Sequence, residues 1–503
     1  MKRAAGVLVN ISSFPGEFGI GGFSKDGEYL VSMISKMGFS WLQVLPITAI
    51  GEGNSPYSGV SSFAGNSLYI NPHRLLAAGL LTADEVRAAR YSGSHFLADY
   101  DFARANTRQL LKTASGRITE EIREEMSAFL AENDDWLPDY ALFMSIAESR
   151  GADWRTWEPP LKNRESAALK KAAAELKESI DYYVFEQYLF YKQWQSFKGY
   201  AAENGVKILG DIPFYCAAAS VDVWANRKQF KLNADGYSDE VAAVPPDYFS
   251  ETGQLWGNPL YDFAAMEKDG YKWWRRRVSH ALKLYDGLRL DHFRAFSEFF
   301  SAPKIGGEFV IKEGKWIKGP GLALIELFKT DNPNGVLIAE DLGIIDEKVK
   351  KLIKDSELPS MKVLQFAFET FDSEHLPHKY DKNCVVYTAT HDNNPTLGWF
   401  FEAREDVRNY ALSYTGAPLF GWGAGGPSCP SSRAFIRTAL SSVADLAVIP
   451  VQDLAGYGSD TRMNVPGVAR GNWRFRVHYE MLNSIDQNYF LELNNLFGRN
   501  MRE

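Results

Sequence analysis

Cysteine is scarce in this chain of 503 residues, and the few cysteines form no pattern. The chain has three, Cys216, Cys384 and Cys429, which are odd in number and far apart. Proteins that depend on disulfides usually carry even sets of cysteines, so this composition argues against a disulfide framework. It favours a reducing compartment, and we expect a cytoplasmic protein.

Long apolar runs and concentrations of positive charge are also missing. No run approaches the roughly 18 apolar residues that span a bilayer. The apolar stretch after Lys2 and Arg3 covers only residues 4–9, which is too short for the core of a signal peptide. The net charge is −8, with no basic patch. Nucleic acids and anionic membranes are therefore not expected as partners.

Two common cofactor signatures are absent as well. The eight histidines never pair at metal-ligand spacing with each other or with cysteines. No glycine-rich phosphate-binding turn follows the first predicted strand. We therefore expect neither a metal nor a nucleotide cofactor.

The sequence does contain many short apolar runs, and 45% of its residues are hydrophobic. Most of these runs are almost continuously apolar, as parallel strands covered on both faces must be. Helical patterns, such as residues 25–37 and 346–354, separate several of them. The pattern predicts a (β/α)₈ TIM barrel, with a doubly wound sheet as the alternative. The predicted strands are residues 6–12, 41–47, 206–215, 287–293, 335–343, 361–368, 384–392 and 446–454.

Two intervals between predicted strands are too long for simple βα units. We expect one catalytic barrel over residues 1–503, with a helical insertion at 74–200 after the second strand. A second insertion, residues 216–285, follows the third strand and combines loops with helices. It contains residues 245–261, a loop rich in proline, glycine and aromatic residues that shows no regular period.

Carboxylates stand at the carboxyl ends of three predicted strands, where TIM barrels carry their chemistry. The fourth strand ends in Asp291, the fifth in Glu340 and the seventh in Asp392. Arg289 shares a strand face with Asp291, and we expect it to hold the pKa of that carboxyl low, as a nucleophile requires. Glu340 shares its face with apolar residues, which should raise its pKa, as a general acid requires.

One carboxyl of low pKa and one of high pKa are the machinery of retaining glycoside chemistry. Each residue alone also has a structural explanation, because strand-end aspartates often cap helices and acidic residues favour helix starts. Residues 391–395 could simply form a turn. Three carboxylates at three strand ends of one predicted barrel together favour catalysis.

Longer motifs are spread over nearly the whole chain. They are SPYSGVSSFAGN (55–66), GDIPFY (210–215), VPPDYFSETGQLWGNPLY (244–261), GLRLDHFR (287–294), IAEDLG (338–343), THDNNPTLGW (390–399), PVQDL (450–454) and RMNVPG followed by GNW (462–473). In these motifs the sequence resembles the 4-α-glucanotransferases (amylomaltases or disproportionating enzymes) of glycoside hydrolase family 77, within the α-amylase clan. The resemblance implies a TIM barrel without a separate C-terminal β-sandwich, which agrees with the helical pattern at 481–497.

The resemblance also implies roles for individual residues. Asp291 would be the nucleophile, Glu340 the acid/base and Asp392 a third carboxylate that binds hydroxyls of the donor sugar. His292 neighbours the nucleophile, but strand alternation turns it to the other face, so we expect a structural role for it. The implied substrate-binding residues are Arg289, His391, Asp211, Tyr57, Ser55, Tyr248, Glu251, Gln254, Trp256 and Asn464. Among them, Asp211 would hydrogen-bond the sugar and Tyr57 would stack on it.

The activity implied is transfer of an α-1,4-glucan segment to the 4-hydroxyl of an acceptor through a covalent glucosyl-enzyme. Substrates would be maltooligosaccharides, amylose, glycogen or starch. An α-amylase-like hydrolase would use the same carboxylates, and a non-catalytic glucan-binding scaffold would keep the same barrel. Transfer requires a held acceptor and a dry intermediate. A loop that covers the cleft with Tyr248 and Trp256 suits that task, so we favour transfer.

Overall fold

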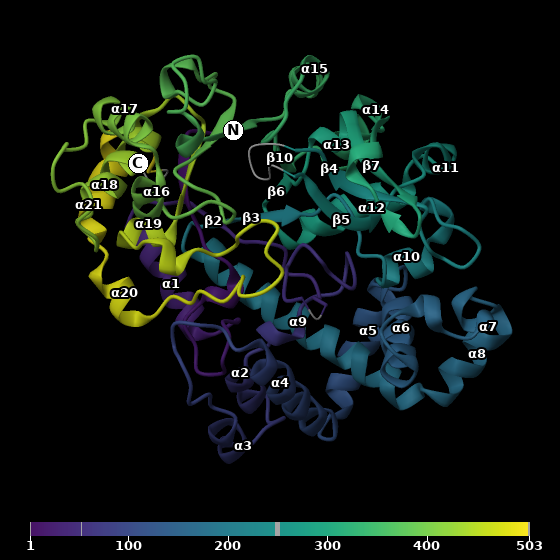
Figure 1. Cartoon of the computed structure of the whole chain (residues 1–503). Coiled ribbons are helices and arrows are strands. Elements are labelled where there is room, and N and C mark those ends of the chain that lie inside the picture. Colours follow the sequence, from purple (N-terminus) through teal and green to yellow (C-terminus); the bar gives the residue numbers. More distant parts are fainter. Residues whose placement is uncertain (1, 52, 247–251, 501–503) are drawn as a thin grey trace.

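The computed structural model describes residues 2–51, 53–246 and 252–500 (Figure 1). Eight parallel strands form the central sheet in the order β10-β6-β3-β2-β1-β13-β12-β11. The first strand pairs with the last, as a barrel requires, so the doubly wound alternative is wrong. The strands are β1 (Ala4–Leu8), β2 (Trp41–Gln43), β3 (Lys207–Ile212), β6 (Gly287–Leu290), β10 (Val336–Ala339), β11 (Ser360–Val363), β12 (Cys384–Tyr387) and β13 (Leu446–Pro450).

The barrel closes between β10 and β11. The backbone N–H of Ala339 donates to the carbonyl of Pro359 at 2.9 Å. The N–H of Met361, in β11, donates to the side chain of Asp341 at 2.6 Å. These bonds join the two edge strands and confirm the predicted TIM barrel.

All eight predicted strands exist, but they end earlier than the apolar patterns indicate. The strand β6 ends at Leu290, β10 at Ala339 and β12 at Tyr387. The apolar runs continue beyond the ladders because the first loop residues are buried too. The three carboxylates therefore lie on loops just beyond the strand ends.

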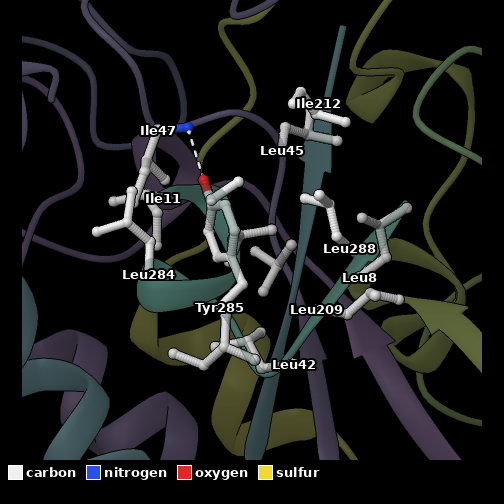
Figure 2. Packing of buried hydrophobic residues seen from close by; sticks show 14 of the residues in the cluster. Leu8, Ile11, Leu42, Leu45, Ile47, Leu209, Ile212, Leu284, Tyr285 and Leu288 are labelled. Carbon is white, nitrogen blue, oxygen red and sulfur yellow. Dashed lines mark hydrogen bonds between the residues drawn. The ribbon is translucent and has the colours of Figure 1, made fainter. Parts of the chain in front are cut away.

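Tyr285 shows how the core supports the barrel wall (Figure 2). Its hydroxyl accepts a hydrogen bond from the N–H of Ile47 at 3.3 Å, and Leu42 and Leu284 lie near its ring. The ring also packs against Gly210 in β3, where an added Cβ would come within 2.2 Å of a ring carbon. Only glycine permits this close approach, and Asp211 follows it directly.

Helices surround the barrel and fill the interval between β2 and β3, which lies at the lower part of Figure 1. Of the predicted helices, residues 25–37 correspond to α1 (Lys25–Lys36) and residues 346–354 to α15 (Glu347–Ser356). The interval before β3 holds α2 (Pro72–Ala77), α3 (Ala83–Ala88), α4 (Tyr100–Ser115), α5 (Glu120–Glu132), α6 (Leu137–Arg150), α7 (Pro159–Lys162), α8 (Ser166–Glu175) and α9 (Lys177–Glu203). Besides α15, the helices after β3 are α10 (Val221–Ala225), α11 (Phe263–Lys268), α12 (Lys272–Leu284), α13 (Arg294–Ser297), α14 (Leu322–Asp331), α16 (Thr396–Glu402), α17 (Glu405–Thr415), α18 (Pro430–Ser441), α19 (Val451–Ala455), α20 (Tyr479–Ser484) and α21 (Gln487–Leu496).

A second, antiparallel sheet stands beside the barrel. Its strands are β4 (Glu240–Val244), β5 (Gln254–Pro259), β7 (Glu298–Ile305), β8 (Glu308–Phe309) and β9 (Lys315–Lys318), in the order β5-β4-β7 with β8 and β9 both on β7. The expectation of an irregular loop is therefore wrong for residues 254–259. The sequence does not reveal these strands, because the pairing of β4 with β5 is interrupted between Val241 and Ala243. On its other edge β4 pairs with β7, which is distant in sequence. Tyr248, Phe249 and Glu251 lie outside the described residues.

The C-terminal part of the described chain is helical. After β13 the described residues contain helices and loops but no further strand, so the expectation of no terminal β-sandwich is confirmed. A survey of the described helices finds none that is both long and apolar enough to cross a membrane.

Candidate active site

A cleft of about 1060 Å³ opens at the carboxyl ends of the barrel strands. Its walls come from the loops that follow β6, β10 and β12, and from the small antiparallel sheet. Most of the predicted site residues line it: Ser55, Tyr57, Gln254, Trp256, Arg289, Asp291, Glu340, His391, Asp392 and Asn464. Tyr248 and Glu251 fall outside the described residues.

The Arg289 guanidinium lies among three carboxyl groups at the floor of the cleft. Its Nη1 is 2.5 Å from Asp211 Oδ2 and 3.0 Å from Asp291 Oδ1. Its Nη2 is 3.9 Å from Glu340 Oε2. Only 5% of the arginine side chain is exposed, so these attractions act with little screening by water.

Asp211 supports the site from below. Its side chain is completely buried and accepts a hydrogen bond from the Tyr57 hydroxyl at 2.7 Å, in addition to the contact with Arg289. These contacts orient Arg289 and Tyr57, and the hydrogen bond expected from Asp211 to the sugar stays a prediction.

The electrostatics of Asp291 differ from the sequence-based expectation of a low pKa. Burial raises the pKa of Asp291 well above its ordinary value, and Arg289 only partly offsets this effect. The reason is that Arg289 is shared, and the carboxylates of Asp211, Glu340 and Asp392 each raise the Asp291 pKa further. The charge on Asp291 therefore depends on the protonation of its neighbours.

Glu340 is fixed by two backbone N–H groups. The N–H of Leu342 donates to Oε1 at 2.8 Å and that of His292 donates to Oε2 at 2.7 Å. Burial raises the pKa of the Glu340 carboxyl, while Arg289 and the two N–H groups lower it less. The predicted upward direction is confirmed, and the carboxyl is held in one orientation.

His292 lines the cleft, so the prediction that its side chain turns to the other face is wrong. Strand alternation fails here because β6 has already ended at Leu290 and His292 has a left-handed backbone, with φ of 49°. Its ring meets Trp256 edge-on at a centroid distance of 4.8 Å. The sequence offered one sign that the strand ends here, namely the charged residues Arg289 and Asp291 just before His292.

Asp392 also lines the cleft, within a set of aromatic and amide side chains. Asn464 Nδ2 donates to Asp392 Oδ1 at 2.6 Å, and His391 Nε2 is 3.4 Å from Oδ2. Tyr57 stacks on His391 at 5.2 Å, and Trp473 contacts both rings. Burial lowers the pKa of His391, which favours a neutral imidazole. Trp473 was not singled out from the sequence, although it belongs to the GNW motif.

The loop that carries His391 and Asp392 is held at both ends by one buried carboxylate. Asp453 accepts hydrogen bonds from Thr388 Oγ1 at 2.5 Å, before the loop, and from Thr396 after it. The Thr396 N–H and hydroxyl both donate at 2.7 Å. Asp453 lies in the PVQDL motif, but its role in positioning this loop could not be inferred without the fold.

The described residues contain no group of three or more His, Cys, Asp or Glu side chains arranged to hold a metal ion. The groups assembled at the cleft floor are acids, one guanidinium and hydrogen-bonding side chains. Such a set can donate a proton, attack an electrophilic carbon and bind hydroxyls. The aromatic walls present flat apolar surfaces for a ligand with both polar edges and apolar faces.

Comparisons with known proteins agree with this chemistry. A family model described as 4-alpha-glucanotransferase matches residues 9–482. The 4-alpha-glucanotransferase of Aquifex aeolicus is 39% identical over 99% of both chains. The chloroplastic/amyloplastic 4-alpha-glucanotransferase of Solanum tuberosum is 40% identical over 95% of this chain and 82% of its own. The structure of amylomaltase from Streptococcus agalactiae in complex with acarbose superimposes with a TM-score of 0.93 at 33% identity, covering 99% of this chain and all of its own.

Proposed function

The chain belongs to the 4-alpha-glucanotransferase family, glycoside hydrolase family 77, and on that premise we propose how its residues divide the reaction. Asp291 is the nucleophile, Glu340 the acid/base, and Asp392 with His391 binds hydroxyls of the donor sugar. The observation that carries this assignment is the Arg289 guanidinium, 3.0 Å from Asp291 and 3.9 Å from Glu340. Both carboxyl groups lie within 3.9 Å of this one guanidinium, and a retaining mechanism needs its two carboxyl groups close together.

In the first step, Glu340 gives its proton to the oxygen of the scissile α-1,4 bond. Asp291 attacks the anomeric carbon, the bond to that oxygen breaks, and the chain on the reducing side leaves. The raised pKa of Glu340 keeps the required proton on the carboxyl. A protonated Glu340 no longer repels a charge on Asp291, so the pair can hold one proton and one charge at the same time.

In the second step, Glu340 is a carboxylate and takes the proton of an acceptor 4-hydroxyl. The acceptor oxygen attacks the anomeric carbon, and the bond to Asp291 breaks. The two inversions give net retention at that carbon. The acceptor occupies the place that the leaving chain vacated, so Glu340 marks the acceptor side of the cleft and Asp392 the donor side.

The substrates we propose are α-1,4-glucans, from maltooligosaccharides to amylose, glycogen or starch. The three cysteines are buried and form no disulfide, which supports a reducing compartment such as the cytoplasm. Trp256 and Leu255 are both exposed on the cleft wall, and they favour a bound sugar over water on the acceptor side. This supports transfer over hydrolysis.

Maltotriose distinguishes transfer from hydrolysis. Transfer breaks one bond and makes one, so glucose and a ladder of longer chains should appear while total reducing ends stay almost constant. Hydrolysis adds one reducing end for each bond cut. Chromatography of the products alongside a reducing-end assay tests the proposal, and a rise in reducing ends without longer chains would overturn it.

A further inference from the structure

Trp316 lies on the wall of the cleft. It comes from the small antiparallel sheet, whereas the three carboxyl groups follow strands of the barrel. It belongs to β9, lines the cleft and is 37% exposed. Large tryptophan side chains are usually buried, so an exposed indole on a substrate cleft calls for a ligand. The resemblance to family motifs did not single it out.

Trp316 ends an apolar row that crosses the small sheet. Leu255 pairs with Ala243, Ala243 with Phe300, and Phe300 with Trp316, on four neighbouring strands. Residues directly opposite one another in a sheet project from the same face. The outer two members, Leu255 and Trp316, are exposed, and both line the cleft. Three strand spacings separate them, roughly 14 Å, so this wall extends well beyond one sugar.

The indole is held in place before any ligand arrives. The Arg294 guanidinium lies over its ring, 3.8 Å from the centroid, and Phe300 meets it edge-on at 5.1 Å. Arg294 is itself buried, and it donates to the Ile344 carbonyl at 2.6 Å and to Asp346 at 3.0 Å. A ring fixed by such contacts binds a ligand with little further loss of conformational entropy.

The position of this wall identifies its side of the cleft. Leu342 and Ile344 lie two and four residues after Glu340 in the chain, and both line the cleft together with Trp316. Glu340 marks the acceptor side in the proposed mechanism. The wall therefore lies where an acceptor chain would continue away from the reacting hydroxyl.

We propose that Trp316 is an aromatic platform for a remote glucose unit of the acceptor glucan. The inference rests on the proposed function and adds a selection for acceptor length. A sugar ring is neutral and has apolar faces, so it stacks on a flat indole. An acceptor of one glucose cannot reach this platform, whereas a longer chain gains its contact and binds more tightly.

The test compares two acceptors with one donor. α-Maltosyl fluoride serves as donor, with glucose or maltotetraose as acceptor, and product chains are measured against acceptor concentration. Trp316→Ala should raise the KM for maltotetraose about tenfold, the worth of a good stacking contact. The KM for glucose and both kcat values should change by less than about twofold. Trp316→Phe keeps a ring and should recover most of the maltotetraose affinity.

Tyr237→Ala is the matched control. Tyr237 is 39% exposed and also stacks with an arginine, Arg155 at 4.8 Å, but it lies outside the cleft lining. Tyr237→Ala should change the KM of neither glucose nor maltotetraose. Equal changes for glucose and maltotetraose in Trp316→Ala, or no change for either, would overturn the platform. A wild-type protein that releases fluoride without elongating any acceptor would instead contradict the proposed function.

Discussion

Arg289 and Asp211 form a buried ion pair beneath the catalytic floor, with Nη1 2.5 Å from Oδ2. The pair fixes the guanidinium that also contacts Asp291. Removing one partner of a buried pair leaves an uncompensated charge and costs about 3–5 kcal/mol. We expect Asp211→Asn to lower the free energy of unfolding by that order and to reduce kcat strongly, because Arg289 can shift away from Asp291.

Tyr57→Phe is the control for this variant, because it removes the 2.7 Å hydrogen bond to Asp211 but leaves the ion pair intact. Loss of this hydrogen bond to a charged acceptor should cost about 1.5–3 kcal/mol of stability, less than the loss of the ion pair. Denaturant unfolding and steady-state kinetics measure both effects. An Asp211→Asn protein as stable and active as Tyr57→Phe would show that the pair does not support the site.

The pH dependence of kcat should be bell-shaped, with both limbs set by raised pKa values. Asp291 must be ionised, so activity falls as pH drops through its raised pKa. Glu340 must be protonated, so activity falls as pH rises through its own raised pKa. Asp392 raises the pKa of Asp291, so Asp392→Asn should move the acid limb to lower pH while it slows turnover. An acid limb that stays in place or moves upward would contradict this coupling.

Gly210→Ala tests whether close packing at Tyr285 holds β3 in place. The new methyl group would meet the ring at 2.2 Å, and overpacking of this kind costs about 1–3 kcal/mol. Gly199→Ala, in α9, is the matched control because nothing lies within 4 Å of its added Cβ. Alanine has a higher helix propensity, so the control should gain up to about 1 kcal/mol. Thermal unfolding of both variants checks the contrast, and similar shifts in the two would refute the packing argument.

Asp453→Ala should disturb the loop that presents His391 and Asp392. It removes the acceptor for Thr388 and Thr396, and each buried donor left without a partner costs about 1–3 kcal/mol. We expect kcat to fall about 10- to 100-fold, with KM less affected, because a misplaced Asp392 weakens transition-state binding. Asp453→Asn keeps one acceptor oxygen, so its kcat should lie between those of Asp453→Ala and the wild type. Stable, fully active Asp453→Ala protein would contradict the positioning role.

The fold was largely predictable because parallel barrel strands are buried on both faces. Runs such as residues 446–454 and 384–392 are apolar for that reason, and each produced a strand. The small antiparallel sheet was not predictable in the same way. Its strand β4 pairs with β7, which lies beyond the whole of β6, and a single sequence carries no local sign of that pairing.

The site was predictable only where the position of a residue along a strand determines where its side chain lies. Asp291, Glu340 and Asp392 follow strand ends, and barrel geometry brings such positions together. The burial of Asp211 and the sharing of Arg289 depend on neighbouring strands, which is why the expected low pKa of Asp291 was wrong. Trp316 reaches the cleft through the unpredicted sheet, which explains why no motif indicated it.

In the proposed mechanism Asp291 forms the covalent intermediate, and Glu340 serves it as acid and base. α-Maltosyl fluoride isolates the two roles, because fluoride departs without a proton from Glu340. Incubated with this donor, Glu340→Gln protein should form the ester quickly and resolve it slowly, since no base remains for the acceptor. Peptide mass spectrometry should then find one maltosyl group on Asp291, and none in an Asp291→Asn, Glu340→Gln double variant. A maltosyl group on Asp392 or another carboxylate, or undiminished turnover by Asp291→Asn alone, would contradict the account.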